Sequence, residues 1–215
     1  MLFLIDTADL KKISECSNYF PVDGVTTNPS IIANTDYSVT LMEIRDLLGP
    51  DKMLHVQVTA NTADGMVEEA KKLVEKLGDN LYIKIPVTLE GIRAIKLLNE
   101  MGIKVTATAI YTAQQALIAA RAGASFVAPY VNRLDLICGN GISVVSDIVQ
   151  VLKNAGLSCK VLAASLKTPE QVNKMALVGC QSVTIYPDLL YQLISHPLTD
   201  AAVEGFEKDW QRKYS

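Results

Sequence analysis

The feature that most constrains the fold is a regular alternation of short apolar segments with amphipathic segments. Along the chain the apolar segments read LFLID, DGVTTN, MLHVQVT, LYIKIPVT, IKVTATA, ASFVAPYV, CKVLAAS and SVTIYP. The segments between them have the spacing of helices, as in residues 62–78, where apolar side chains recur every three or four residues. Eight such units predict strands that pair in parallel, with helices connecting them. The sheet is then either a closed (β/α)8 barrel or an open doubly wound sheet.

The closed barrel fits better. The first apolar segment is followed by no GxGxxG fingerprint, and CGNG at 138–141 is only a loop with two glycines. We therefore predict an α/β protein with a (β/α)8 TIM barrel fold, a single domain over residues 1–215. It is compact, since ~250 residues is typical of this architecture. Helix starts are predicted at Thr62 or Asn61, Thr88, Thr112 and Thr168, and helix ends at Gly78, Gly102, Gly123, Gly156 and Gly179.

The tail TDAAVEGFEKDWQRKYS predicts an additional C-terminal helix at about 199–213 that carries the single tryptophan, Trp210. Trp210 packs either on its own barrel or on a neighbouring subunit. The sequence leaves both arrangements open.

Composition limits the class of partner. A net charge of −3, with 49% hydrophobic and 20% charged residues, is ordinary for a globular protein and argues against nucleic acid as a partner. The N-terminal MLFLIDTADL is a first strand rather than a signal peptide or a membrane span. We expect no membrane association. Four cysteines without CxxC spacing, at 16, 138, 159 and 180, predict reduced thiols and a cytoplasmic location.

Metal binding is not expected. The two histidines, His55 and His196, have neither HxH nor HExxH spacing. His55 is predicted to be a hydrogen-bonded residue of the barrel core.

Strand alternation predicts which side chains face the barrel axis. In LYIKIP, Leu81, Ile83 and Ile85 form the face covered by helices, so Tyr82 and Lys84 point inward. The same rule places further polar side chains inside, at or beyond the C-terminal halves of their strands, where barrels build active sites. These are Asp6, His55, Gln57, Thr59, Thr106, Thr108, Tyr130 and Asn132.

Lys84 is the most unusual of these positions, because lysine is seldom buried without a partner. A lone lysine at a strand end can simply extend its amine to solvent. Convergence with an aspartate, a glutamine and a tyrosine instead favours a functional site. Burial lowers the pKa of an amine, and a neutral lysine forms an imine with a ketone, which then accepts electrons when an adjacent carbon–carbon bond breaks.

A phosphate site is predicted at the same end of the barrel. Ser165 and Lys167 follow the seventh strand, and Arg133 follows the sixth. Singly, Arg133 could pair with Asp135 and Lys167 could be a solvated loop charge. Together with an imine-forming lysine they favour a sugar phosphate as substrate.

Several motifs resemble the transaldolase family, and in particular its fructose-6-phosphate aldolase branch. They are DTAD at 6–9, GVTTNPSIIA at 24–33, QV at 57–58, YIKIPVT at 82–88, AGASFVAPYVNR at 122–133 and VLAASLKTP at 161–169. The resemblance implies a (β/α)8 barrel and a class I, Schiff-base mechanism without metal or other cofactor. It also implies a homo-oligomer, a pentamer or decamer, in which C-terminal helices contact neighbours.

The resemblance also assigns residue roles. Lys84 matches the imine-forming lysine and Asp6 the carboxylate beside it. Other matches are Thr26 and Asn28 to residues that hold substrate hydroxyls, Gln57 and Thr108 to the pair that positions a water, and Arg133 and Ser165 to the phosphate contacts. Lys167 stands where transaldolases usually have arginine. The resemblance therefore implies that an ammonium group, which acts as a point charge, replaces a planar guanidinium in binding the phosphate.

Two positions favour the aldolase branch. Gln57 and Tyr130 stand where transaldolases typically have glutamate and phenylalanine. A tyrosine hydroxyl can relay a proton, whereas glutamine cannot take one up. The expected activity is therefore an aldehyde-lyase that cleaves or forms fructose 6-phosphate, with dihydroxyacetone and glyceraldehyde 3-phosphate as the partner compounds.

Three alternatives remain open. The first is a transaldolase, a transferase of the pentose phosphate pathway that converts sedoheptulose 7-phosphate and glyceraldehyde 3-phosphate to erythrose 4-phosphate and fructose 6-phosphate. The second forms the imine on Lys167, as in barrels resembling deoxyribose-phosphate aldolase. The third is a sugar-phosphate-binding barrel without turnover.

Overall fold

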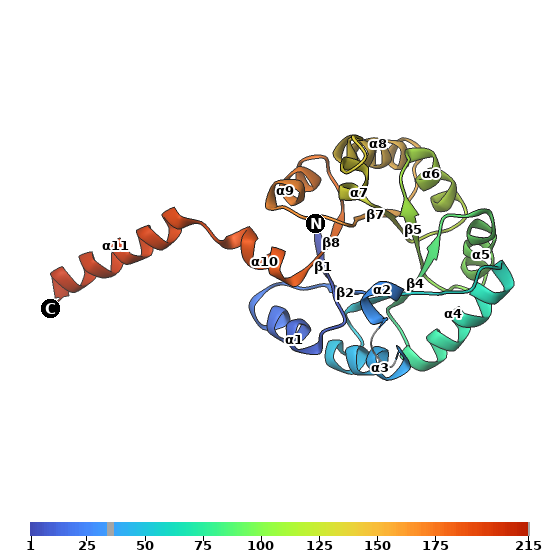
Figure 1. Cartoon of the computed structure of the whole chain (residues 1–215), viewed down its shortest axis with the longest axis horizontal. Coiled ribbons are helices and arrows are strands. Elements are labelled where there is room, and N and C mark those ends of the chain that lie inside the picture. The colour runs from blue at the N-terminus through green and yellow to red at the C-terminus, as the bar shows by residue number, and fades with distance from the viewer. Residues whose placement is uncertain (34–36, 215) are drawn as a thin grey trace.

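The computed structural model describes residues 1–33 and 37–214, and in these residues eight parallel strands close into a barrel in chain order (Figure 1). Each strand pairs with the next, and β8 pairs with β1. The strands are β1 Leu2–Asp6, β2 Gly24–Thr26, β3 Met53–Gln57, β4 Leu81–Pro86, β5 Val105–Ile110, β6 Phe126–Pro129, β7 Lys160–Ala163 and β8 Ser182–Ile185. The closed barrel predicted from the alternation is confirmed, and the open sheet is excluded.

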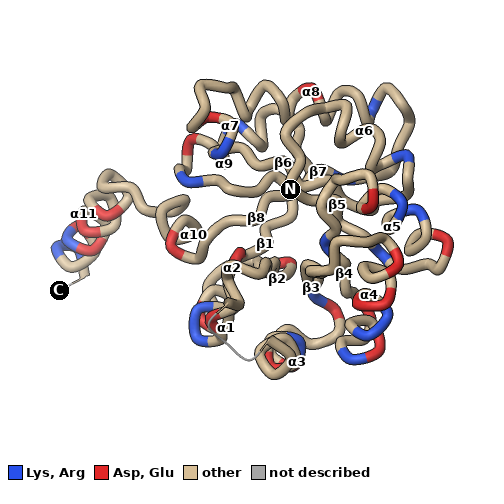
Figure 2. Tube along the Cα trace, turned by 45° about the vertical axis from the view of Figure 1, so that its right-hand side comes forward, with Lys and Arg blue, Asp and Glu red and all other residues tan. Residues whose placement is uncertain are grey.

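Helices surround the strands (Figure 1). Their bounds are α1 Leu10–Tyr19, α2 Pro29–Ile32, α3 Tyr37–Leu48, α4 Ala63–Leu77, α5 Leu89–Glu100, α6 Ala113–Arg121, α7 Val131–Asp135, α8 Gly141–Asn154, α9 Pro169–Leu177, α10 Pro187–Ile194 and α11 Pro197–Tyr214. Figure 2 shows acidic and basic residues interspersed along helices such as α4, α5 and α11. No described helix combines the length and the apolar character needed to cross a lipid bilayer.

The helix boundaries follow the sequence signals. The side chains of Thr62, Thr88, Thr112 and Thr168 each accept a hydrogen bond from a backbone N–H in the first turn. The glycines predicted to end helices all have positive φ, which a residue without Cβ adopts readily. They are Gly78, Gly102, Gly123, Gly156 and Gly179.

Apolar side chains pack in two places, between the strands and the helices and inside the barrel. Ile83 and Ile85 of β4 belong to the larger cluster, which lies between strands and helices. A smaller cluster inside the barrel contains Leu4 and Phe126, with Tyr82 packed against it. The alternation predicted for β1 and β4 is therefore confirmed.

His55 is part of the barrel interior, as predicted. It is fully buried, its Nδ1 lies 2.9 Å from Thr106 Oγ1, and its ring stacks on Tyr82 with 4.6 Å between centroids. Burial first, and then the charge of Lys84, holds the pKa of His55 well below its usual range. The ring is therefore neutral.

Two positions that were predicted to point inward lie past the ends of their strands. β6 ends at Pro129 and α7 begins at Val131, so strand alternation does not extend to Asn132, whose backbone N–H donates to the Ser165 carbonyl. Likewise β3 ends at Gln57, and Thr59 lies beyond it, where both its N–H and its hydroxyl donate to Glu69 of α4. Side chains alternate between the two faces of a sheet only within a strand.

The C-terminal helix begins two residues before its predicted start and extends away from the barrel (Figure 1). None of its described residues is buried. Trp210 is 66% exposed, and its ring contacts Tyr214 of the same helix at 4.2 Å between centroids. Of the two arrangements left open for Trp210, packing on its own barrel is not observed.

Candidate active site

Lys84 lies inside the barrel near the C-terminal end of β4. Its neighbours Ile83 and Ile85 are fully buried on the opposite face, and Lys84 itself is only 6% exposed. Its Nζ donates a hydrogen bond of 2.7 Å to the Thr27 carbonyl oxygen. That carbonyl is well positioned, because the N–H and hydroxyl of Thr27 both donate to the His55 carbonyl. Lys84 therefore does not extend to solvent.

The environment of Lys84 favours the neutral amine. Burial lowers the pKa of Lys84, and the carboxylate of Asp6 opposes this by raising it. The net shift is downward. A larger fraction of the amine is consequently unprotonated at a given pH than for a lysine in water.

Hydroxyl groups surround the Asp6 carboxylate. Thr26 Oγ1 donates to Asp6 Oδ1 at 2.6 Å, and the same hydroxyl lies 2.6 Å from Thr184 Oγ1. Because β1 pairs with both β2 and β8, these three side chains come from adjacent strands. The network fixes the direction in which the carboxylate points toward the cavity.

A small cavity of about 70 Å³ opens at this end of the barrel. It collects side chains from most of the strands. The lining residues are Asp6, Thr26, Asn28, Lys84, Thr108, Ala128, Tyr130, Arg133, Leu162, Ala164, Ser165, Thr184 and Tyr186. Eight residues selected from the sequence thus meet at one place: Asp6, Thr26, Asn28, Lys84, Thr108, Tyr130, Arg133 and Ser165.

Two hydroxyls that line the same cavity as Lys84 are hydrogen-bonded to each other. Thr108 Oγ1 and Tyr130 Oη lie 3.0 Å apart, and either can be the donor. The β5–β6 register shifts between Ala107 and Ile110, and Ala109 has φ 57°. Such irregularities next to active sites re-aim a side chain. Here the shift immediately follows Thr108.

The side-chain oxygen of Asn28 is engaged in hydrogen bonds. Its Oδ1 caps α2 by accepting hydrogen bonds from the N–H groups of Ser30 and Ile31 at 3.0 and 3.1 Å. The amide nitrogen has two further donors. Since Asn28 lines the cavity, these donors can hold a substrate oxygen.

Aromatic rings hold the cations at the cavity mouth. The Arg133 guanidinium lies over the Tyr130 ring, 4.7 Å from its centroid, and a hydrogen bond with Tyr111 raises the pKa of Arg133. Lys167 Nζ lies over the Tyr186 ring at 4.1 Å. Both arrangements are cation–π contacts. They give this end of the cavity a positive charge suited to a phosphate.

Comparison with known proteins places the chain in a family. The model of the transaldolase/fructose-6-phosphate aldolase family matches residues 3–214. The chain belongs to this family. Membership indicates an enzyme of the aldolase or transaldolase type, without distinguishing the two branches.

A solved structure described as "Native KDPGal structure" shares the fold. It is similar to this member of the transaldolase/fructose-6-phosphate aldolase family at 17% sequence identity and a TM-score of 0.60, over 85% of this chain and 80% of that chain. At that identity the similarity concerns the barrel alone.

Two residues that the family resemblance singled out do not line the cavity. Gln57 is opposite Lys84 in the β3–β4 register, but its side chain is not part of the cavity wall. Lys167 is exposed, and its amine lies over the ring of Tyr186, which does line the cavity. Both stand next to the cavity rather than in it.

Thr184 and Tyr186 line the cavity although the sequence analysis did not select them. For Thr184 the signal was present, because alternation within SVTI places it on the face opposite Val183 and Ile185. Tyr186 follows the end of β8, where alternation does not apply.

Cysteines play no part in the site. All four are free thiols, and Cys16 and Cys180 are buried. No group of three or more metal-ligating side chains occurs among the described residues.

Proposed function

We propose that the protein is a class I aldolase that cleaves fructose 6-phosphate to dihydroxyacetone and glyceraldehyde 3-phosphate, and catalyses the reverse condensation, through an imine on Lys84. The observation that carries the proposal is a buried amine with a lowered pKa, facing Asp6 inside the mouth of the barrel. Such an amine is the nucleophile that imine chemistry requires. No metal or cofactor is part of the proposed reaction.

In the first step neutral Lys84 attacks the C2 carbonyl of the open-chain ketose. The carbinolamine loses its hydroxyl as water, and the product is an iminium ion on Nζ. Asp6, with its hydroxyl network through Thr26, is placed to stabilise this cation and to transfer protons during the loss of water. Asn28 holds a hydroxyl of the dihydroxyacetone unit.

In the second step the C3–C4 bond breaks. Tyr130, acting directly or through a water held with Thr108, takes the proton of the C4 hydroxyl. The C3–C4 bonding electrons move to form a C2–C3 double bond while the iminium nitrogen becomes neutral, and glyceraldehyde 3-phosphate leaves. The remaining enamine is protonated at C3, and water hydrolyses the imine to release dihydroxyacetone and free Lys84.

The phosphate is proposed to bind beside Arg133 and Ser165. Both residues line the cavity, and Lys167 Nζ lies over the ring of Tyr186, another lining residue. Arginine offers a planar fork of donors to phosphate oxygens, whereas lysine acts as a point charge. Arg133 is therefore assigned the direct contact and Lys167 a longer-range attraction.

Transaldolase activity is the alternative that this family also includes. It would require the enamine to persist until an acceptor aldose arrives. The Thr108–Tyr130 hydroxyl pair, at 3.0 Å, supports the aldolase because it can deliver the proton that ends the enamine's lifetime. Gln57 has no acidic proton to supply, and its side chain lies outside the cavity wall.

A single assay separates the two activities. Free dihydroxyacetone is measured from fructose 6-phosphate with and without erythrose 4-phosphate. The aldolase releases dihydroxyacetone in both conditions. A transaldolase would release no dihydroxyacetone in either condition and would form sedoheptulose 7-phosphate only when erythrose 4-phosphate is present. That result would assign the chain to the transaldolase branch.

The pH dependence of imine formation tests the role of Asp6. Because the Lys84 pKa is lowered from its ordinary 10.5, imine formation should rise with pH and level off below that value. Asp6 raises this pKa, so Asp6→Asn should move the midpoint of the rise to lower pH. The measurement is the initial rate of borohydride-trapped imine with dihydroxyacetone across pH.

Asp188→Asn is the matched control, since Asp188 is exposed and pairs with Lys12 outside the cavity. Its midpoint should equal that of the parent. A midpoint that stays fixed or moves to higher pH in Asp6→Asn would contradict the proposed contact between the carboxylate and the amine.

Arg133 should affect only phosphorylated substrates. Arg133→Met is expected to raise KM for fructose 6-phosphate by about tenfold to a hundredfold, as the loss of a charge-assisted hydrogen bond does. Imine trapping with dihydroxyacetone, which has no phosphate, should change little. Lys167→Met should have the smaller effect on KM. Equal effects of Arg133→Met on both compounds would show that the arginine supports the site rather than the phosphate.

We also propose a homo-oligomer in which α11 packs on a neighbouring subunit, and a cytoplasmic location consistent with free thiols. Five large apolar side chains of α11 are at least half exposed: Leu198 72%, Val203 50%, Phe206 71%, Trp210 66% and Tyr214 62%. Burial of these side chains would be the gain on assembly. Light scattering should give a mass above that of one chain, and Trp210→Glu should lower it. A monomeric parent would contradict this arrangement.

A further inference from the structure

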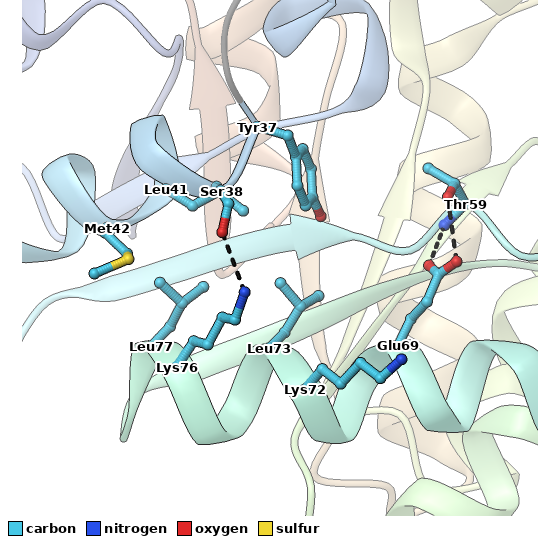
Figure 3. A pocket seen from close by; sticks show the side chains of 10 residues that line it. All are labelled: Tyr37, Ser38, Leu41, Met42, Thr59, Glu69, Lys72, Leu73, Lys76 and Leu77. Carbon is cyan, nitrogen blue, oxygen red and sulfur yellow. Dashed lines mark hydrogen bonds between the residues drawn. The ribbon is translucent and has the colours of Figure 1, made fainter.

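A second cavity lies on the outer shell of the barrel, between α3 and α4. Its volume is about 370 Å³, within the range of about 300–1,000 Å³ that small-molecule sites occupy. It shares no residue with the cavity around Lys84. The lining residues are Tyr37, Ser38, Leu41, Met42, Thr59, Glu69, Lys72, Leu73, Lys76 and Leu77 (Figure 3).

The floor of this cleft is apolar. Leu41 of α3 and Leu73 and Leu77 of α4 are buried, at 1%, 8% and 4% exposure. Met42 stands at the edge and is 49% exposed. Figure 3 shows Leu73 and Leu77 pointing from α4 toward the α3 side chains. A hydrocarbon group placed here would cover the small surface that these leucines expose, and it would remove the exposed side chain of Met42 from water.

The rim carries positive charge. Lys72 and Lys76 are one helical turn apart on α4 and both line the cleft. Lys76 extends toward Ser38, and Lys72 lies along α4 toward Glu69 (Figure 3). Lys76 Nζ lies 3.2 Å from Ser38 Oγ. Among the ion pairs between described residues, neither lysine takes part.

The carboxylate in the lining is already engaged. Glu69 accepts hydrogen bonds from the Thr59 N–H at 2.7 Å and from the Thr59 hydroxyl at 3.2 Å. Both of its oxygens thus point to the end of β3 rather than toward the lysines. Among the described residues that line the cleft there are two cations and one carboxylate, and that carboxylate accepts hydrogen bonds from Thr59, so these residues favour an anion.

The walls exist before any ligand binds. Tyr37 Oη donates to the Gln57 carbonyl at 3.4 Å, Glu69 joins α4 to the residues that follow β3, and Lys76 joins α4 to α3. Burial first, and then Glu69, raises the pKa of Tyr37 to about 12, so its hydroxyl remains a neutral donor. A preformed site loses less entropy on binding than one that must be assembled.

We propose that the α3–α4 cleft binds a small amphipathic anion, a carboxylate with a short hydrocarbon chain, with its head group between Lys72 and Lys76 and its chain on Leu41, Leu73 and Leu77. A cation of the same shape would meet two ammonium groups. A neutral hydrocarbon would leave both charges without a partner. The cleft is thus a second ligand site, separate from the sugar-phosphate cavity.

Octanoate is the probe, titrated into the full chain by calorimetry, with octylammonium as the ligand of equal length and opposite charge. Octanoate should bind and octylammonium should not. Lys72→Met and Lys76→Met, which keep the apolar stems, should each weaken octanoate binding by about tenfold, the effect of removing one charge-assisted hydrogen bond. Met42→Glu, a change at an exposed edge position, should weaken it by like-charge repulsion.

Lys71→Met is the matched control, because Lys71 is on the same helix but pairs with Glu68 at 2.8 Å and does not line the cleft. It should bind octanoate as the parent does. Binding that is equal for the two probes, or unchanged in the Lys72→Met/Lys76→Met double variant, would overturn the proposal. Loss of octanoate binding in Arg133→Met would also overturn it, since the anion would then occupy the catalytic cavity. None of these outcomes bears on the aldolase assay.

Discussion

Lys84→Met is expected to reduce kcat/KM for fructose 6-phosphate by about 10⁴-fold or more. Methionine keeps an unbranched side chain of similar length but has no amine, and removal of a covalent nucleophile eliminates the reaction path instead of weakening it. The fold should persist, because the one hydrogen bond lost is that to the Thr27 carbonyl, and methionine suits an apolar interior. The measurements are steady-state dihydroxyacetone release and circular dichroism of the variant.

Lys167→Met is the control for this experiment. Lys167 is exposed, does not line the cavity and lies over the Tyr186 ring, so its removal should leave kcat within about tenfold of the parent. If Lys167→Met were inactive while Lys84→Met retained turnover, the imine would belong to Lys167, and the mechanism proposed for Lys84 would be wrong.

Tyr130→Phe should give the second largest effect. Loss of a general acid–base hydroxyl typically costs about 10²–10⁴-fold, and that loss is expected in dihydroxyacetone release. Phenylalanine retains the ring beneath Arg133, so the substitution isolates the hydroxyl that lies 3.0 Å from Thr108. Borohydride trapping of the imine should be nearly unchanged, and transfer to erythrose 4-phosphate should rise relative to release.

Tyr111→Phe is the matched control, since its hydroxyl contacts Arg133 but Tyr111 does not line the cavity. It should affect KM for the phosphorylated substrate more than the release step. Equal losses in Tyr130→Phe and Tyr111→Phe, with a parallel loss of imine trapping, would mean that Tyr130 supports the cavity and does not transfer the proton.

The barrel was predictable because its determinants are local. Threonine caps, positive-φ glycines and apolar periodicity each act over a few residues, and the repeated unit leaves few topologies to choose from. The inward direction of Lys84, Asp6 and Thr108 followed from the alternation of side chains along each strand. Once the strands close in chain order, side chains at their C-terminal ends must meet.

The errors have physical causes as well. Asn132 and Thr59 lie past the ends of their strands, and alternation cannot show where a strand stops. The contact between the Lys167 amine and the Tyr186 ring joins residues that are distant in sequence, so the sequence did not predict it. The cleft between α3 and α4 depends on how two helices pack, and neither helix shows it alone.

Reduction with borohydride in the presence of dihydroxyacetone, followed by peptide mass mapping, tests the central claim most directly. A buried amine with a lowered pKa at the barrel mouth predicts a reduced three-carbon adduct on the peptide that contains Lys84, and no adduct in Lys84→Met. An unmodified Lys84 peptide, or an adduct confined to Lys167, would contradict it.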